Sequence, residues 1–302
     1  MKKYITGILF VFVLSMINSI NVSAEIQKNA SLWFPVNYSG TYTSAQGMCI
    51  DDDRNIYIAK LNNYNNVILY KITKDGKKEK EELYSYSVLG HANDMTYCPE
   101  NGHIYIATCD DAVEYSVIEL NQSLEIVNKY KPSNFPKMKT TASGIAYEPE
   151  YNVFYLKYWK KIYIYTCDFK TGKFTYEDTV KLDEGSYSGY TRQGVSANNG
   201  LVFMPLFNLQ GSRENSVIRV YEIIKKSNGK FSANYLDTYQ IDISSRGYFE
   251  IESIDFINNV MIFMTNGSKK GKGSYDEIYR VPPCKYLTEH SIHAKDRKNE
   301  QK

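Results

Sequence analysis

The segments Gln46-Gly47-Met48-Cys49-Ile50 and Asn93-Asp94-Met95-Thr96-Tyr97 decide the fold, because their pattern occurs three more times, at residues 143–147, 193–197 and 252–256. In each copy a polar residue is followed by a small or acidic one, an aliphatic one, a mostly small one and a mostly bulky one. Successive copies begin 47, 50, 50 and 59 residues apart. The chain therefore contains five imperfect repeats.

Each repeat continues with short runs that have the composition of β-strands. In the first repeat these runs are residues 56–59, 67–72 and 83–86, which are rich in Ile, Leu and Tyr. Such runs between turn residues are typical of strands. Four short strands in a unit of about fifty residues predict a blade of a β-propeller. We therefore predict an all-β fold, a single five-bladed propeller of four-stranded blades, with a β-sandwich or a two-domain β protein as the alternative.

The fifth repeat lacks an obvious fourth strand after Tyr286. The N-terminal segment Ser31-Leu32-Trp33-Phe34-Pro35-Val36 has the composition of a strand. We predict that this segment completes the last blade, because closing the ring in this way removes two open sheet edges.

Residues 1–24 have the features of a signal peptide. Two lysines are followed by an apolar run from Ile8 to Met16 and by small residues at 22–24. The apolar run is too short to cross about 30 Å of hydrocarbon comfortably, which argues against a retained anchor. We predict cleavage near Ala24 and a protein that is secreted, extracellular or loosely associated with the cell surface.

The predicted boundaries leave a propeller domain at residues 25–287 and a polar tail at residues 288–302. The composition, with 43% hydrophobic residues, 28 Tyr and 13 Phe among 302 residues, excludes a disordered chain. The 36 basic and 34 acidic residues become 34 and 34 once the two leader lysines are removed. A nucleic-acid partner normally requires a basic excess, so we expect none. We also expect a monomer with no integral membrane segment, and a solvated hairpin loop at the mixed-charge run 74–82.

The five cysteines, Cys49, Cys98, Cys109, Cys167 and Cys284, form no metal-site pattern. None stands in Cys-x-x-Cys spacing, which argues against structural zinc, and we expect neither a metal nor a cofactor. An odd count leaves at least one thiol unpaired. We expect buried free thiols, with one disulfide of unassigned partners as the alternative.

Candidate ligand-binding residues follow from propeller geometry. The start of each innermost strand and the end of the second strand face the same side of the disc, so polar residues at these places share one mouth. Converging polar groups in a concave place are typical of a ligand site. The alternative is that the neutral residues only satisfy backbone groups near the axis. The predicted ligand-binding residues are Gln46, His91, Asn93, Ser143, Arg192, Gln193 and Glu250.

Asp94 and Glu252 are the candidate catalytic residues, because the repeats do not require acids at these places. Two carboxyl groups from different blades can act as general acid and base on a glycosidic bond. They can equally bind a cation together with Asn93, so the presence of calcium in the pore stays open.

The run from His91 to Tyr97, with Gln46-Gly47, Gln193-Gly194 and Glu250–Ile254, resembles repeats in secreted propeller-like proteins of Gram-positive bacteria, nearest to the helveticin J-like bacteriocin group. This resemblance extends over most of the chain after the leader. It implies a secreted antibacterial or cell-envelope-binding protein without defined catalytic residues. Gln46-Gly47 and the Glu252 segment also resemble the propeller type of glutaminyl cyclotransferase, although the Trp-rich surroundings of that type are missing.

Two functions from different classes follow. We favour a binding protein that holds a glycan, peptide or cell-envelope ligand at its pore mouth, because the sequence has no Gly-x-Ser-x-Gly, Walker or Gly-x-Gly-x-x-Gly motif. The alternative is a pore-centred hydrolase, lyase or glutaminyl cyclotransferase that uses Asp94 and Glu252.

Overall fold

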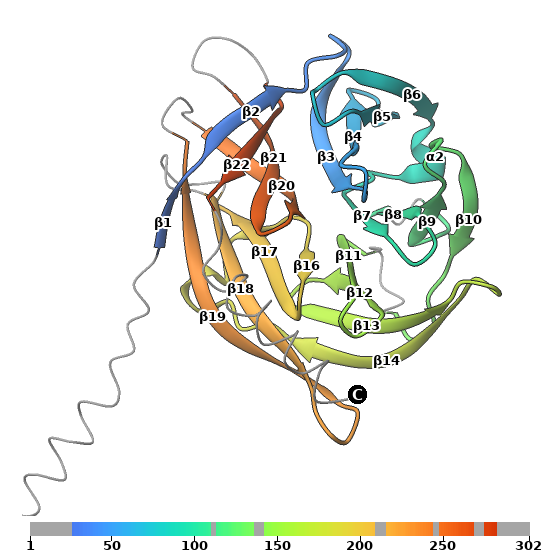
Figure 1. The fold of residues 1–302 in the computed structure, drawn as a ribbon, viewed down its shortest axis with the longest axis vertical. Coiled ribbons are helices and arrows are strands. Elements are labelled where there is room, and N and C mark those ends of the chain that lie inside the picture. Colours follow the sequence, from blue (N-terminus) through green and yellow to red (C-terminus); the bar gives the residue numbers. More distant parts are fainter. Residues whose placement is uncertain are drawn as a thin grey trace, which may run out of the picture.

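The computed structural model describes residues 26–109, 113–135, 142–208, 216–243, 248–268 and 275–282. These residues form five sheets arranged around a ring, which confirms the five-bladed β-propeller (Figure 1). The predicted leader, the polar tail and Cys284 lie outside the described residues. No helix within the described ranges is long and apolar enough to cross a membrane.

The first three blades each have four strands in simple order from the axis outward. Blade 1 consists of β3 (Tyr42–Ile50), β4 (Ile56–Asn62), β5 (Val67–Ile72) and β6 (Lys78–Tyr84). Blade 2 follows the short helix α2 (Tyr86–Leu89) and consists of β7 (Asp94–Cys98), β8 (His103–Ala107), β9 (Val117–Leu120) and β10 (Ile126–Tyr130). Blade 3 consists of β11 (Gly144–Glu148), β12 (Val153–Tyr158), β13 (Lys161–Asp168) and β14 (Lys173–Lys181).

Blade 4 departs from this pattern at its inner edge. After the 3₁₀ turn η1 (Gly185–Tyr187), its innermost strand is divided into β15 (Thr191–Arg192) and β16 (Ser196–Asn198), which both pair with β17. The residues between these two short strands reach the axis, and the Gly194 amide donates to the Glu252 carbonyl of blade 5 at 3.1 Å. The remaining strands of blade 4 are β17 (Leu201–Phe207), β18 (Ser216–Lys225) and β19 (Phe231–Asp242).

The N-terminal segment closes the ring. Blade 5 consists of β20 (Tyr248–Ile257), β21 (Val260–Ser268), β22 (Glu277–Val281) and, as its outermost strand, β2 (Ser31–Pro35), which confirms the predicted closure. A strand that the sequence did not predict, β1 (Ile26–Asn29), pairs in parallel with β19 of blade 4. The start of the described chain thus joins the outer edges of two blades (Figure 1).

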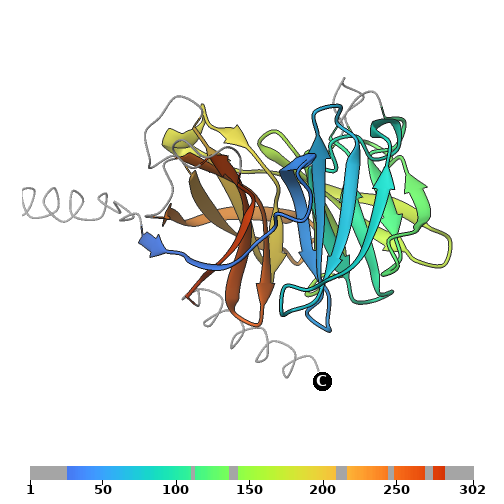
Figure 2. The same cartoon turned by 90° about the horizontal axis from the view of Figure 1, so that it is seen from above.

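Apolar side chains fill the spaces between neighbouring blades, and blade 5 packs directly against blade 1 (Figure 2). Tyrosines supply much of this volume. Tyr57, Tyr105 and Tyr155, from the second strands of three blades, are wholly buried. The hydroxyls of Tyr57 and Tyr105 donate to the carboxyl groups of Asp51 and Glu119, at 3.0 and 2.9 Å. The tyrosine excess is therefore mainly packing between blades.

The four described cysteines carry free thiols. Cys49 and Cys98 are buried, whereas Cys109 and Cys167 are partly exposed. Burial raises the pKa of the Cys98 and Cys167 thiols to about 12, so these two side chains behave as small neutral groups at ordinary pH.

Candidate functional site

Asp94 lies on the axis of the propeller and is wholly buried. One carboxylate oxygen accepts the amides of Ile145 and Val195 at 3.0 and 2.8 Å, and the other accepts the Ser253 hydroxyl at 2.8 Å. That hydroxyl also lies 3.0 Å from the Met48 carbonyl oxygen. Because these five residues belong to five different blades, the carboxyl group of Asp94 joins the inner strands of the whole ring.

The second column of the sequence repeat explains why one carboxyl group fits there. The other members of this column are Gly47, Gly144, Gly194 and Ser253. A Cβ atom on Gly194 would lie 2.6 Å from a carboxylate oxygen of Asp94, and one on Gly144 would lie 3.2 Å from the other. Gly144 and Gly194 therefore leave the space that the single acid fills.

Burial raises the pKa of Asp94 to about 7, although the hydrogen bonds that it accepts act in the opposite direction. The carboxyl group has no exposed surface, and both of its oxygens accept hydrogen bonds from protein groups. This environment favours an architectural role for Asp94 over attack on a substrate.

Glu252 lies in a second polar cluster, nearer the mouth. A register shift in β20 between Ile251 and Ser253 leaves the Glu252 side chain next to that of Glu250. Glu252 is 2% exposed, and burial, followed by the charge and hydrogen bond of Glu250, raises its pKa well above the ordinary value. Gln193 donates to the Glu250 carboxylate at 2.8 Å. The described contacts thus bring Glu252 together with two predicted ligand-binding residues.

Three further predicted residues make contacts within the ring. Gln46 donates to the Ala45 carbonyl at 2.8 Å, and Asn93 donates to the Ser143 carbonyl at 2.7 Å. The half-buried ring of His91 packs edge-on against Tyr86 with 5.7 Å between centroids, and burial lowers its pKa. For Gln46 and Asn93 these contacts fit the alternative that polar residues at strand starts satisfy backbone groups.

A cavity of about 410 Å³ opens between blades 3 and 4 on the mouth face, where inner strands begin and second strands end. We call it the Trp159 cavity. Two predicted ligand-binding residues, Ser143 and Arg192, line it, whereas the other predicted residues do not. The lining residues are Cys109, Ser143, Tyr158, Trp159, Gly189, Tyr190, Thr191 and Arg192.

Trp159 is the exposed aromatic side chain of the wall. It forms the turn between β12 and β13, is 61% exposed and has a φ of 54°. A bulky residue in the left-handed region is an outlier that costs free energy, and such outliers gather at functional sites. The Arg192 guanidinium lies 5.5 Å from the centre of the indole ring, within the range of a cation–π contact.

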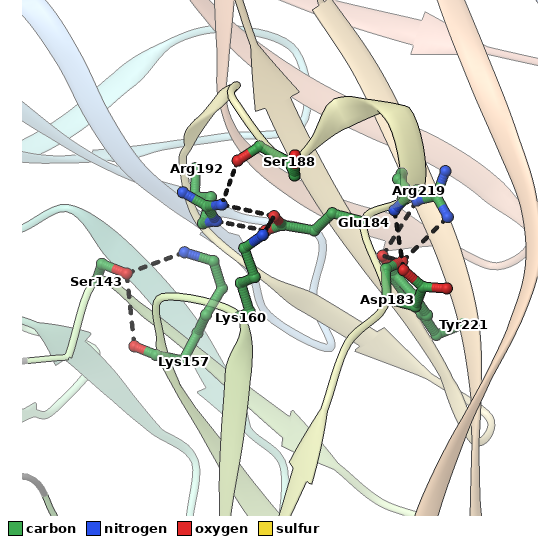
Figure 3. Close-up of polar contacts among 10 residues, drawn as sticks. Ser143, Lys157, Lys160, Asp183, Glu184, Ser188, Arg192, Arg219 and Tyr221 are labelled. Atoms are coloured by element: carbon green, nitrogen blue, oxygen red, sulfur yellow. Dashed lines mark hydrogen bonds and ion pairs between the residues drawn. The ribbon is translucent and has the colours of Figure 1, made fainter.

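Arg192 is held in place by a buried acid. Its guanidinium donates to both carboxylate oxygens of Glu184, and the ammonium of Lys160 lies 3.1 Å from the same group (Figure 3). Arg192 also donates to the Ser188 carbonyl at 2.9 Å. The bidentate geometry fixes the plane of the guanidinium, so the wall beside Trp159 is rigid.

A second arginine anchors the loop that carries Glu184. Arg219 is buried and lies 3.9 Å from the centre of the Tyr235 ring. Its guanidinium and the Tyr221 hydroxyl both donate to the Asp183 carbonyl, at 3.0 and 2.7 Å (Figure 3). The loop that forms one side of the cavity is therefore tied to blade 4.

The Lys157 ammonium donates at 2.9 Å to the hydroxyl of Ser143, a residue that lines the cavity (Figure 3). Lys157 is wholly buried, and burial lowers its pKa to about 8. The sequence reasoning missed both Lys157 and Trp159. The available signal was the polar and aromatic run Lys157-Tyr158-Trp159-Lys160 at the end of a second strand, where the shared mouth was expected.

No group of three or more potential metal ligands occurs among the described residues. Asn93 donates its amide nitrogen to a carbonyl, and the oxygens of Asp94 accept hydrogen bonds from the axis. Of the proposed cation ligands, Asp94 thus has both carboxylate oxygens in hydrogen bonds with protein groups.

No protein-family model and no curated protein matches the sequence. Solved structures with the same fold include the tail fiber of Staphylococcus aureus phage P68, at 14% identity and a TM-score of 0.58, which covers 89% of this chain and 56% of the phage chain. The chain thus spans a little over half the length of that protein. A GH43 β-xylosidase/α-arabinofuranosidase from a compost microbial metagenome is more distant, at 10% identity and a TM-score of 0.48, over 83% of this chain and 94% of the other. At 14% identity the likeness to the tail fiber shows the fold alone.

Proposed function

We propose that the protein is a ligand-binding propeller that holds a glycan in the Trp159 cavity. The single observation that carries the proposal is the exposed indole of Trp159 at the rim of a concave polar site. Sugar rings present apolar C–H faces and polar edges, and an indole beside hydroxyl and guanidinium groups offers a surface for both.

The surroundings of Trp159 support this proposal. Tyr158 and Tyr190 add two further aromatic side chains to the wall, and Ser143 adds a hydroxyl group. Arg192 and its buried partner Glu184 hold the wall rigid before a ligand arrives. A preorganised wall lowers the entropy that a ligand must lose on binding.

We place this activity outside the cell. The predicted signal peptide at residues 1–24 supports export, and the resemblance to helveticin J-like proteins favours a cell-envelope glycan as the ligand. N-terminal sequencing of the protein from the medium of a producing culture is expected to begin near Glu25. A retained leader on the isolated protein would contradict export by cleavage.

The binding proposal is tested on an array of bacterial cell-envelope glycans with the intact protein and the Trp159→Ala variant. Removal of an aromatic anchor typically costs at least about 2 kcal/mol, so we expect binding to weaken about thirty-fold. Trp33→Ala, which alters the other tryptophan of the chain, is the matched control and should bind normally. Equal binding by Trp159→Ala would place the ligand elsewhere, and no binding by the intact protein would refute the proposal.

A pore-centred hydrolase is the second candidate, and the contact between Glu250 and Glu252 favours it. Burial, together with the charge and hydrogen bond of Glu250, raises the pKa of Glu252 well above its ordinary value, which suits Glu252 to the role of general acid. In this form of the proposal Glu252 acts with Glu250 rather than with Asp94. Turnover of a cell-envelope glycan that Glu252→Gln abolishes would support it, whereas the same turnover in Glu252→Gln would exclude it.

A further inference from the structure

Two of the described lysines are buried, and their surroundings differ in one respect. The Lys60 ammonium lies 2.6 Å from the Asp276 carboxylate and 2.7 Å from the Val36 carbonyl oxygen. The Lys157 ammonium has the neutral Ser143 hydroxyl as its hydrogen-bond partner among the described residues. A buried ammonium is costly without a counter-charge. Lys60 has that counter-charge within hydrogen-bond distance, and Lys157 does not.

The charged groups near Lys157 are bound to other partners. Asp94 is held by the amides and the hydroxyl at the axis, and Glu184 is held by Arg192 and Lys160. The positive charge of Arg192 disfavours the ammonium form of Lys157. A thiolate at Cys109 would favour the ammonium form, but burial raises the pKa of this thiol and keeps it neutral.

Ser143 connects this lysine with the cavity. Its side chain accepts the hydrogen bond from Lys157, and its residue lines the cavity. The hydroxyl proton of Ser143 makes only a long contact, 3.5 Å, to the Lys157 carbonyl oxygen. A hydroxyl group can accept and donate at the same time, so this proton is available to a ligand.

We propose that the pair formed by Ser143 and Lys157 is an anionic subsite of the Trp159 cavity, which takes the carboxylate or phosphate group of an acidic sugar. The inference rests on the proposed glycan binding and names the class of glycan. The anion accepts the Ser143 hydroxyl, and its charge balances the ammonium behind that hydroxyl.

Binding of an anion is therefore coupled to protonation of Lys157. With a pKa of about 8 in the free protein, the amine is about half protonated at pH 8 and almost fully protonated at pH 6. A bound anion favours the ammonium. We expect uptake of up to about half a proton per site at pH 8 and almost none at pH 6.

The test begins with an array that carries glucose, glucuronic acid and glucose 6-phosphate, and N-acetylglucosamine with its 6-phosphate. We expect the acidic sugars to bind at least ten times more tightly than the neutral ones. Lys157→Met and Ser143→Ala are expected to abolish this preference, whereas Lys71→Met, at a partly exposed lysine, should keep it. Comparison of the glucuronic acid and phosphate spots identifies which anion is preferred.

Calorimetric titration with the better acidic sugar, in two buffers of different ionisation enthalpy, measures the proton uptake on the unaltered protein. This arm does not depend on the stability of Lys157→Met. Equal binding of acidic and neutral sugars, or acidic binding without proton uptake at pH 8, would overturn the anionic subsite and leave glycan binding in place. Absence of binding to every sugar on both arrays would refute the proposed function and the subsite together.

Discussion

Replacing Asp94 by alanine removes the acceptor at which the inner strands meet. The Ile145 and Val195 amides then lose their partner in a place without solvent, whereas Ser253 can still donate to the Met48 carbonyl. A buried donor left without an acceptor costs about 1–3 kcal/mol. We therefore expect Asp94→Ala to lower the free energy of unfolding by about 2–6 kcal/mol at pH 5, where the carboxyl group of the intact protein is mostly neutral.

Asp94→Asn tests the same site in a different way. The amide oxygen of asparagine can accept the two backbone amides, and its nitrogen can donate to Ser253, so the hydrogen bonds survive. The pKa of Asp94 is raised to about 7 in the folded protein and is close to 3.8 in the unfolded chain. The folded state therefore holds the proton more tightly, and this contribution to stability is present at low pH and is lost as the pH rises through 7.

From pH 5 to pH 8 the loss amounts to about 2–3 kcal/mol for this one group. We expect the unfolding free energy of Asp94→Asn to depend less on pH than that of the intact protein by this amount. Guanidinium unfolding followed by circular dichroism at both pH values measures the difference. Glu148 and Asp255, whose pKa values are also raised to about 7, act equally in both proteins. An unchanged pH dependence in Asp94→Asn, or a loss below about 1 kcal/mol in Asp94→Ala, would refute the reasoning.

Two further substitutions probe the same framework by equilibrium unfolding. Gly194→Ala places a methyl group 2.6 Å from the Asp94 carboxylate and should lower the free energy of unfolding by about 1–3 kcal/mol. Gly40→Ala is the control and should cost little, because nothing lies within 4 Å of its Cβ position. Equal effects of the two substitutions would contradict the steric argument. Lys60→Met leaves the buried Asp276 carboxylate without its counter-charge and should lower the free energy of unfolding by about 3–5 kcal/mol. Lys71→Met, in a partly exposed pair, is the control and should cost less than about 1 kcal/mol. A small effect at Lys60 would contradict the buried pairing.

The sequence predicted the ring because the axis imposes a constraint on every repeat. One column had to be small or acidic in all five copies, and the strands that follow it had to be apolar on both faces to fill the spaces between blades. The closing strand Ser31–Pro35 was predicted for a physical reason as well, since an open ring leaves two unpaired edges.

The outer edges of the blades were harder to predict. The mixed-charge run 74–82 was expected to be a hairpin loop, but Lys78–Tyr84 forms the strand β6 and only the preceding residues form the turn. Its side chains are exposed or half-buried, so alternating Lys and Glu residues are tolerated, as on other edge strands. The parallel strand Ile26–Asn29 has no local signal, because its partner lies in a blade more than two hundred residues away.

The site was only partly predictable for a related reason. Ser143 and Arg192 were found because they stand at strand starts that share the mouth. Lys157 lies near the end of the second strand of blade 3, and Trp159 lies in the turn that follows it. The surroundings of Trp159 include Arg192, which is held by the neighbouring loop that carries Glu184. That loop is positioned by contacts with blade 4, and the sequence pattern of blade 3 does not reveal them.

Fluorescence of Trp159 tests the central claim most directly, because the chain has only two tryptophans. In the Trp33→Phe protein all indole emission arises from the cavity, and in Trp159→Phe it arises from blade 5. Titration with a glycan that binds on the array should change the emission intensity and wavelength of the first protein, with a midpoint equal to the dissociation constant, and leave the second unchanged. Saturable binding without any change in Trp159 emission would contradict the assignment of this cavity as the binding site.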